Sequence, residues 1–193
     1  MLKAEKQLTD QHKMTVVVLH GTGGNSQDQW FPWLASELKK KGYTVWVPDL
    51  PGADEPDINQ YNPYILKNCP FTIDQNTIVI GHSSGAVAAF GLVQILTVRI
   101  NKIISVAGFV DDLDYKPVKK MFRTWKFNWK IIKTKAKKFT IICSDNDPFV
   151  PAKHGKELQR LLDGDLKIMP GQKHFSVSTN PKYTIFPELL ELI

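Results

Sequence analysis

Apolar residues in this chain form short continuous runs, separated by stretches in which apolar residues recur at helical spacing. The runs that predict strands are 15–19, 43–47, 77–80, 103–106, 139–143 and 166–169. Spacings of three and four predict helices at 28–41, 60–67, 84–96, 151–162 and 185–193. Strands that are apolar at nearly every position and alternate with helices are typical of a parallel sheet covered on both faces. The pattern therefore predicts an α/β fold, a three-layer α/β/α sandwich around a six-stranded parallel sheet.

Length and composition fit an ordinary globular protein with one sizeable core. The chain has 193 residues, of which 42% are hydrophobic and 23% are charged. We expect a polar N-terminal arm over residues 1–13 and a single domain over residues 14–193. No apolar stretch approaches membrane-spanning length and the N-terminus lacks an apolar signal core, so we expect a cytoplasmic protein without a transmembrane segment. The two cysteines, Cys69 and Cys143, are expected to be free thiols in that compartment.

Positive charge is concentrated in one segment. The net charge is +6, yet residues 115–138 contain ten Lys and Arg and no Asp or Glu, so the rest of the chain is net acidic. Apolar residues recur through the segment at steps of three and four: Val118, Met121, Phe122, Trp125, Trp129, Ile132 and Ala136. The spacing predicts two short helices packed on the sheet with their lysines in solvent. Alternatives are a basic mouth for anionic substrates or peripheral contact with an anionic lipid surface; nucleic acid is not expected, because no binding module accompanies the charge.

The most informative stretch is an apolar run that leads into Gly81-His82-Ser83-Ser84-Gly85 and then into a helical pattern. Gly-x-Ser-x-Gly between a strand and a helix is typical of a nucleophile elbow, a sharp turn that lifts a serine Oγ above the sheet edge. The serine in such a turn has a strained backbone, and glycines at 81 and 85 would remove side chains that collide across it. The alternative is an ordinary Gly/Ser turn. We predict that Ser83 is a nucleophile.

A serine hydroxyl needs a base to attack at neutral pH. The chain offers five histidines, which are His12, His20, His82, His154 and His174. His174 is the predicted base, because it lies in a loop just after the last strand and can reach over the elbow. We expect His20 and His82 to support the two glycine turns, and His12 and His154 to be exposed on the arm and on a helix.

The acid that orients the histidine is expected in the loop after the fifth strand, which reads Ser144-Asp145-Asn146-Asp147-Pro148. Asp147 is preferred, because it directly precedes the proline turn into the next helix. Asp145 is the competitor, and whichever of the two is not catalytic is expected to cap a turn. Asp111 and Asp112, after the fourth strand, are more remote alternatives.

Attack on a carbonyl group also requires hydrogen-bond donors for the developing oxyanion. The backbone N–H of Ser84, the residue after the nucleophile, is one expected donor. The Thr22 amide, in the loop His20-Gly21-Thr22-Gly23-Gly24, is the expected second donor. A phosphate cradle is the alternative for this loop, but it lacks the Gly-Lys-Ser/Thr ending of a P-loop and the spacing of a dinucleotide site. All these loops follow strands, so the candidates should converge on one edge of the sheet.

In their order along the chain, these motifs resemble the RBBP9/YdeN-type serine hydrolases, a family of small α/β-hydrolases. The resemblance rests on the loops 20–25, 48–51, 81–85, 144–151 and 171–175 and on Trp30 and Trp33. It covers the chain from about residue 14 to the C-terminus. It implies a sheet order of 2-1-3-4-5-6, little or no lid, and a catalytic triad at Ser83, Asp147 and His174. The lysine-rich segment and the longer polar arm depart from the family pattern.

These residues predict a serine hydrolase that acts on a small acyl substrate. An ester, thioester or activated amide would be cleaved through an acyl-enzyme on Ser83, without a metal or a cofactor. We expect a shallow pocket, because the chain is short and has little lid. The alternative is a non-catalytic binding or regulatory protein on the same scaffold, which would hold a partner with its basic face or its Trp-rich loops. The triad favours the enzyme, because a pure binder needs neither base nor acid.

Overall fold

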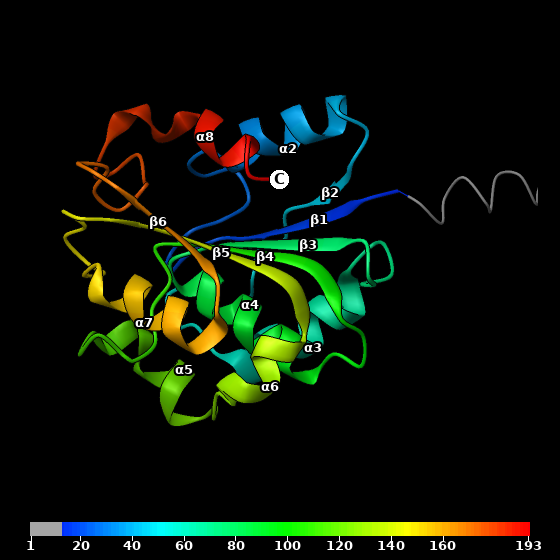
Figure 1. Ribbon diagram of the computed structural model, residues 1–193, viewed down its shortest axis with the longest axis horizontal. Helices are drawn as coiled ribbons and strands as arrows, with labels where there is room; N and C mark the ends of the chain where they lie inside the picture. Colours follow the sequence, from blue (N-terminus) through cyan, green and yellow to red (C-terminus); the bar gives the residue numbers. More distant parts are fainter. Residues whose placement is uncertain (1–12) are drawn as a thin grey trace, which may run out of the picture.

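The computed structural model describes residues 13–193, and its centre is a sheet of six parallel strands (Figure 1). The strand order is β2-β1-β3-β4-β5-β6, which confirms the order implied by the resemblance. The chain moves from β1 outward to the edge strand β2, and then returns to β3 on the other side of β1. The order thus reverses between β1 and β3, and parallel sheets bind ligands at the carboxyl ends of the strands at such a point.

Every predicted strand is present. The bounds are β1 Thr15–Leu19, β2 Thr44–Trp46, β3 Thr77–His82, β4 Ile100–Val106, β5 Ala136–Ser144 and β6 Asp165–Met169. β4 and β5 begin earlier than predicted, because Ile100 pairs with Ala136 at the far end of the sheet. Ala136, which the apolar spacing had assigned to a helical stripe, is therefore the first residue of a strand.

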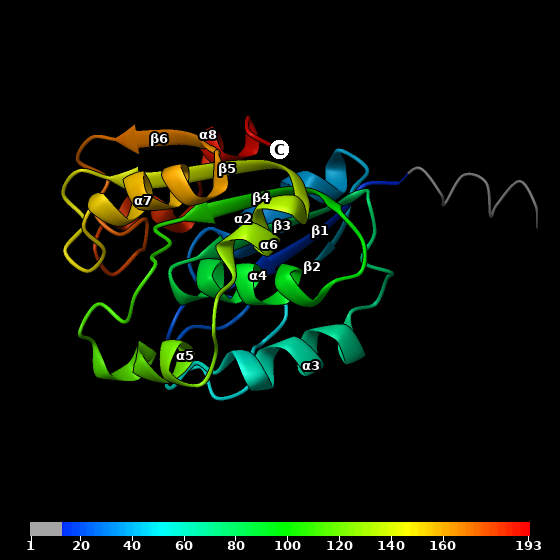
Figure 2. The same ribbon diagram turned by 60° about the horizontal axis from the view of Figure 1, so that its bottom comes forward.

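Helices cover both faces of the sheet (Figure 1), which confirms the three-layer prediction. One face carries α2 (Phe31–Lys40), η2 (Pro181–Thr184) and α8 (Pro187–Leu190), and the other carries α4 (Ser84–Ile95), α6 (Trp129–Thr134) and α7 (Lys153–Leu162). On that second side, α3 (Ile58–Asn68) packs against α4, and η1 (Lys116–Val118) and α5 (Lys119–Arg123) lie further from the sheet (Figure 2). α2 begins at Phe31 rather than near residue 28, and α8 is much shorter than the predicted closing helix. Within residues 13–193, no helix combines the length and the apolar character needed to cross a membrane.

The strands are apolar at successive positions because each face of the sheet has its own core. In β1, Val16 and Val18 belong to the core under α2 and α8. Val17 and Leu19 belong to the core under α4 and α7. Side chains alternate between the two faces of a strand. When both faces are covered by helices, neither faces solvent, and both carry apolar residues.

The basic segment forms short helices whose apolar residues turn inward, as predicted, but α6 contacts β5 whereas η1 and α5 lie further from the sheet. Val118, Met121 and Ile132 are buried, whereas most of the lysines are exposed. Trp129 packs its ring against Phe90 of α4 at a centroid distance of 5.5 Å. Packing on the protein therefore explains the apolar stripe, and the charge is left on the outer surface.

Candidate active site

Ser83 occupies the turn between β3 and α4, with backbone angles φ 56° and ψ −123°. A positive φ is rare for any residue other than glycine, and it persists only where the surroundings enforce it. Here the Ser83 N–H donates to the Val106 carbonyl at 2.8 Å, and the Ser83 carbonyl accepts from the Ala86 N–H at 2.9 Å. The predicted strain at the elbow is confirmed, and it is held by β4 on one side and by α4 on the other.

The two glycines of the elbow are required for different reasons. A Cβ on Gly81 would lie 2.4 Å from backbone atoms of Gly85 and Ala86, so this glycine clears the turn itself. A Cβ on Gly85 would lie 2.2 Å from the Leu19 carbonyl oxygen, so this glycine lets α4 approach the end of β1. The predicted collision across the turn is therefore right for Gly81 and wrong for Gly85, whose neighbour is the adjacent strand.

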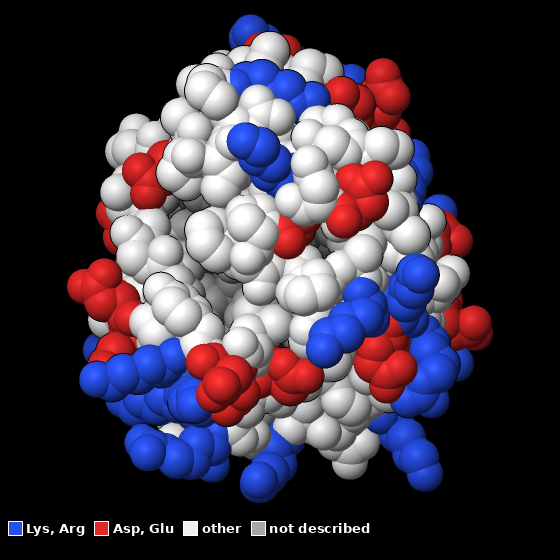
Figure 3. Space-filling view, turned by 90° about the vertical axis from the view of Figure 1, so that its left-hand side faces the viewer, with Lys and Arg blue, Asp and Glu red and all other residues white. Residues whose placement is uncertain are grey.

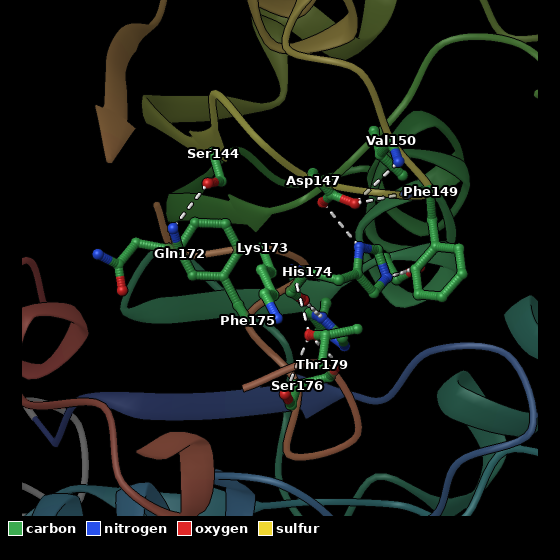
Figure 4. Close-up of polar contacts among 12 residues, drawn as sticks. Ser144, Asp147, Phe149, Val150, Gln172, Lys173, His174, Phe175, Ser176 and Thr179 are labelled. Carbon is green, nitrogen blue, oxygen red and sulfur yellow. Dashed lines mark hydrogen bonds and ion pairs between the residues drawn. The ribbon is translucent and has the colours of Figure 1, made fainter. Parts of the chain in front are cut away.

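The imidazole of His174 lies between the hydroxyl of Ser83 and the carboxylate of Asp147. Its Nε2 is 3.1 Å from Ser83 Oγ. Its Nδ1 is 2.7 Å from Asp147 Oδ2, a contact that Figure 4 shows. Because a carboxylate only accepts hydrogen bonds, Nδ1 carries the proton, and Nε2 is free to accept from the serine hydroxyl. The sequence-predicted nucleophile, acid and base are thus brought into one hydrogen-bonded chain.

Asp147 is held so that one oxygen faces the imidazole. Its Oδ1 accepts from the N–H groups of Phe149 and Val150, at 2.8 and 3.0 Å, which leaves Oδ2 for His174. The carboxylate side chain is only 1% exposed. The ring of Phe149 packs edge-on against the His174 ring at 5.0 Å (Figure 4). A buried, fully hydrogen-bonded carboxylate next to an imidazole can stabilise the imidazolium that forms when the base accepts a proton.

The loop that carries Asp147 is fastened to the loop that carries His174. Three successive side chains accept hydrogen bonds from three successive amides: Ser144 from Gln172 at 2.9 Å, Asp145 from Gly171 at 2.8 Å, and Asn146 from Lys173 at 2.8 Å. Figure 4 shows the first of these contacts. The rival acid Asp145 therefore has a structural contact of its own, of the capping kind expected for the aspartate that does not face the histidine.

His82 supports the elbow from inside, as predicted for the histidines of the glycine turns. Its Nε2–H donates to the His174 carbonyl at 2.8 Å, and its ring lies 4.9 Å from the His174 ring. Burial, together with the neighbouring His174, lowers the pKa of His82 to about 3. His20 is similar in function: its Nδ1–H donates to the Gly21 carbonyl, and its Nε2 accepts from the Leu50 amide. Both rings therefore support the backbone of the glycine turns through their hydrogen bonds.

The loop after β1 lies directly against the nucleophile. A Cβ on Gly21 would lie 3.1 Å from Ser83 Cβ, so the loop is in contact with the elbow. Thr22 Oγ1 donates to Ser84 Oγ at 2.9 Å, which ties together the two residues predicted to supply oxyanion donors. Ser84 is the first residue of α4, where backbone N–H groups have no acceptor within the helix. Both residues are thus close to Ser83, and the Ser84 amide is at the helix end that favours negative charge.

A cavity of about 470 Å³ opens above Ser83 and His174. One wall is apolar and comes from the segment after β4 and the loop after β5, with Phe109, Leu113, Val118, Phe149 and Val150. The other lining residues are mostly polar and include Thr22, Asp28, Gln29, Ser176 and Ser178. Among the described lining residues there are carboxylates but no lysine or arginine, so the positive charge of residues 115–138 lies outside the cavity. Figure 3 shows the carboxyl edge of the sheet, with a hollow near the centre, acidic side chains below it, and basic side chains along the lower rim.

Comparison with known proteins identifies the family. The sequence model of the serine hydrolase family matches residues 16–192. The chain belongs to the serine hydrolase family. This serine hydrolase is 28% identical over 162 residues to YdeN of Bacillus subtilis (strain 168), which covers 83% of this chain and 85% of YdeN. It is 26% identical to the serine hydrolase RBBP9 of Rattus norvegicus, covering 94% of this chain and 93% of RBBP9. The crystal structure of the B. subtilis ydeN gene product superposes with a TM-score of 0.84 at 25% identity, covering 93% of this chain and 96% of that one.

One histidine of this serine hydrolase is not where the sequence placed it. His154, expected on an exposed part of its helix, is only 3% exposed. It shares the inner side of α7 with Leu158 and Leu162, at steps of four residues. Burial lowers the pKa of His154. The prediction was wrong because it followed the polar type of His154, whereas the spacing of four residues from Leu158 places its side chain on the buried side of the helix. His12 lies outside the described residues.

Other candidates are resolved by their contacts. The more remote aspartates, Asp111 and Asp112, accept hydrogen bonds from the amides of Leu113 and Asp114, so they cap a turn. Both cysteines are free, as predicted; Cys143 is buried and Cys69 is half-buried. Among residues 13–193, no group of three or more His, Cys, Asp or Glu side chains is placed to hold a metal ion. The fastening of the two loops by Ser144 and Asn146 was not predicted, because nothing in the motif indicates which backbone amides these side chains meet.

Proposed function

We propose that this serine hydrolase cleaves a carboxylic ester, thioester or activated amide through an acyl-enzyme on Ser83, with His174 as base and Asp147 as acid. The observation that carries the proposal is the hydrogen-bonded chain from Asp147 through His174 to Ser83. A nucleophile and a base within hydrogen-bond reach, with the base oriented by a third group, is the arrangement that activates a serine hydroxyl.

In the first half-reaction, Ser83 Oγ attacks the carbonyl carbon while its proton passes to His174 Nε2. The carbonyl electron pair moves to the oxygen, and the tetrahedral intermediate then collapses. The bond to the leaving group breaks as His174 returns the proton to it. In the second half, water attacks the acyl carbon and gives one proton to His174. The second tetrahedral intermediate then collapses: the bond to Ser83 Oγ breaks, His174 returns the proton to that oxygen, and the carboxylic acid leaves. Asp147 stabilises the imidazolium in both halves.

The oxyanion would accept hydrogen bonds from the backbone amides of Thr22 and Ser84. Support comes from the contact between the Gly21–Thr22 loop and the elbow and from the position of Ser84 at the N-terminus of α4. The loss of one such donor typically reduces the rate by about 10²–10³. The Thr22 Oγ1 contact with Ser84 would hold the two donors at a fixed separation.

The cavity walls favour a small to medium apolar acyl group. Apolar side chains of the wall formed by Phe109, Leu113 and Val118 would bury the chain, and the volume of about 470 Å³ limits its length. Hydrolysis of chromogenic esters of graded chain length is the direct test. We expect turnover by the wild type, with kcat/KM reaching a maximum at short or medium chains, and no turnover above background by Ser83→Ala. Equal rates for the wild type and Ser83→Ala would refute the proposal.

A further inference from the structure

We propose that the outer surface of η1, α5 and α6 docks the protein onto an anionic lipid bilayer. The basic face consists of Lys116, Lys119, Lys120, Arg123, Lys126, Lys130 and Lys133. Figure 3 shows basic side chains along the lower rim of the molecule, the side on which α5 and α6 lie in Figure 1. A cluster of Lys and Arg close to a membrane surface is attracted by the negative potential of anionic lipids.

The basic face stands on a firmly attached support. Lys120 Nζ is 3.1 Å from the buried carboxylate of Asp57, the N-cap of α3, and this contact ties α5 to α3. Gln94 of α4 holds the connection to α6, because its amide nitrogen donates to the Lys126 carbonyl and its oxygen accepts from the Asn128 N–H. Beneath the basic face, Val118, Met121 and Ile132 are buried in the core. The cations are therefore displayed on an ordered surface rather than on a loose loop.

Four of these cations are available to a partner. Lys119, Lys120 and Lys133 form ion pairs with Asp114, Asp57 and Asp163. Lys116, Arg123, Lys126 and Lys130 are exposed, and among residues 13–193 none of them lies within ion-pair distance of a carboxylate. Each Lys or Arg near an anionic bilayer strengthens binding by about fivefold.

An apolar groove accompanies the charge. It is lined by Phe127, Trp129, Ile131 and Leu161, with Lys126 and Lys130 at its edge, and Ile131 is 42% exposed. Apolar surface bordered by lysines fits a lipid interface, where headgroups meet the cations and acyl chains meet the apolar side chains. A nucleic acid fits less well. The rings of Phe127 and Trp129 stack on each other at 5.5 Å, half-buried, and so are not free to stack on bases.

Docking would also place the active-site cavity next to the membrane. Tyr115 and Val118 line that cavity, and Lys116 and Lys119 of the basic face are their neighbours in the chain. An apolar ester in the bilayer would then lie close to the apolar wall. This consequence rests on the proposed function, whereas the docking itself does not.

The test is cosedimentation of the full chain with vesicles of phosphatidylcholine, alone or with about a third phosphatidylglycerol, at low and at near-physiological salt. We expect binding to the anionic vesicles only, weakening as salt rises. Lys126→Glu with Lys130→Glu should reduce the partition coefficient by about 25-fold or more, because two contributions of about fivefold are lost. Lys39→Glu with Lys41→Glu, at the exposed end of α2, makes the same change of net charge and should reduce it by less than about threefold.

Absence of a preference for anionic vesicles, or equal losses in the two double variants, would overturn the proposal. Tighter binding to a single-stranded polynucleotide than to the vesicles would assign the basic face to nucleic acid instead, and would equally overturn it. Melting temperatures verify folding, and Lys126→Gln with Lys130→Gln replaces the charge reversal if that variant does not fold. Labelling of Ser83 by a fluorophosphonate, measured on the same samples, separates a failure of docking from a failure of the proposed function.

Discussion

Asp145 and Asp147 are separated by one residue, yet their carboxylates face different partners. Asp147 receives the imidazole Nδ1–H of His174, and Asp145 receives the backbone N–H of Gly171. Asp147→Asn should reduce kcat/KM by about 10⁴, because an amide at this position stabilises the wrong tautomer and cannot stabilise the imidazolium. Asp145→Asn keeps an oxygen for Gly171, and should reduce kcat/KM by less than about tenfold.

Steady-state kinetics on a chromogenic ester, with melting temperatures as the folding control, distinguish the two variants. A large loss in Asp145→Asn together with a small loss in Asp147→Asn would reassign the acid. Similar, moderate losses in both would mean that the loop matters only as a support for His174.

His82 makes the stability of the fold depend on pH. Its pKa falls from an ordinary value of 6.5 to about 3 in the folded protein, because the ring is buried next to His174. Between these values the unfolded chain binds a proton that the folded protein does not, so the contribution is complete above pH 6.5 and is lost as the pH falls. From pH 7 to pH 5 this residue alone should reduce the free energy of unfolding by about 2 kcal/mol.

His82→Gln tests this linkage, because a glutamine can still donate to the His174 carbonyl but does not titrate. Urea unfolding at pH 7 and pH 5 should show a smaller loss of stability in the variant than in the wild type. His154 is present in both proteins, so its own lowered pKa cancels in the comparison. Parallel pH profiles would contradict a neutral, buried His82.

At the scale of elements, α4 packs closely against its neighbours, and Gly85 and Gly91 differ in how well they would tolerate a side chain. A Cβ on Gly85 meets the backbone of β1 at 2.2 Å, whereas a Cβ on Gly91 meets side-chain atoms of Ile58 at 2.6 Å. Gly85→Ala should therefore destabilise the protein by about 3 kcal/mol or more, because the backbone of β1 is fixed in the sheet and cannot move away from the added methyl group. Gly91→Ala should cost only about 1 kcal/mol, since Ile58 can move and alanine favours the helix.

Denaturant unfolding of the two variants checks the comparison, and the m-value shows whether unfolding remains two-state. Equal stabilities, or a smaller loss for Gly85→Ala, would mean that α4 and β1 can separate at the elbow without cost.

The elements themselves could be predicted because each strand of a doubly covered sheet is apolar along its length. Their ends could not always be predicted. Ala136 fits a helical stripe and a strand equally well, and its strand pairing with Ile100 decides the matter. His154 is polar in type but buried in fact. Its spacing from Leu158 and Leu162 places it on the inner side of α7, but a polar residue type favours solvent, and here the helical spacing decides.

At the scale of the whole molecule, the candidate site could be predicted because parallel strands deliver their following loops to one edge. The loops after β1, β3, β5 and β6 carry Thr22, Ser83, Asp147 and His174, and the topology alone brings them together. The hydrogen bonds that hold the Asp147 loop against the His174 loop could not be predicted. The fastening of residues 144–146 to the amides of 171–173 depends on the alignment of β5 with β6, in which Ser144 pairs with Met169.

The position of the positive charge relative to the cavity could be learned only from the structure. Segment 115–138 lines part of the cavity and also carries the basic face. The sequence indicated the apolar stripe and the lysines, but it could not show that the lysines point away from the cavity. The separation leaves the site itself without positive side chains among the described lining residues.

The most direct measurement is the mass of the protein after incubation with a fluorophosphonate probe, followed by mapping of the modified peptide. An activated serine reacts with such a probe, whereas an ordinary surface serine does not. We predict one adduct per chain, located on Ser83, that is absent in Ser83→Ala and greatly slowed in His174→Ala. An unmodified, correctly folded wild type, or an adduct on another residue, would contradict the account.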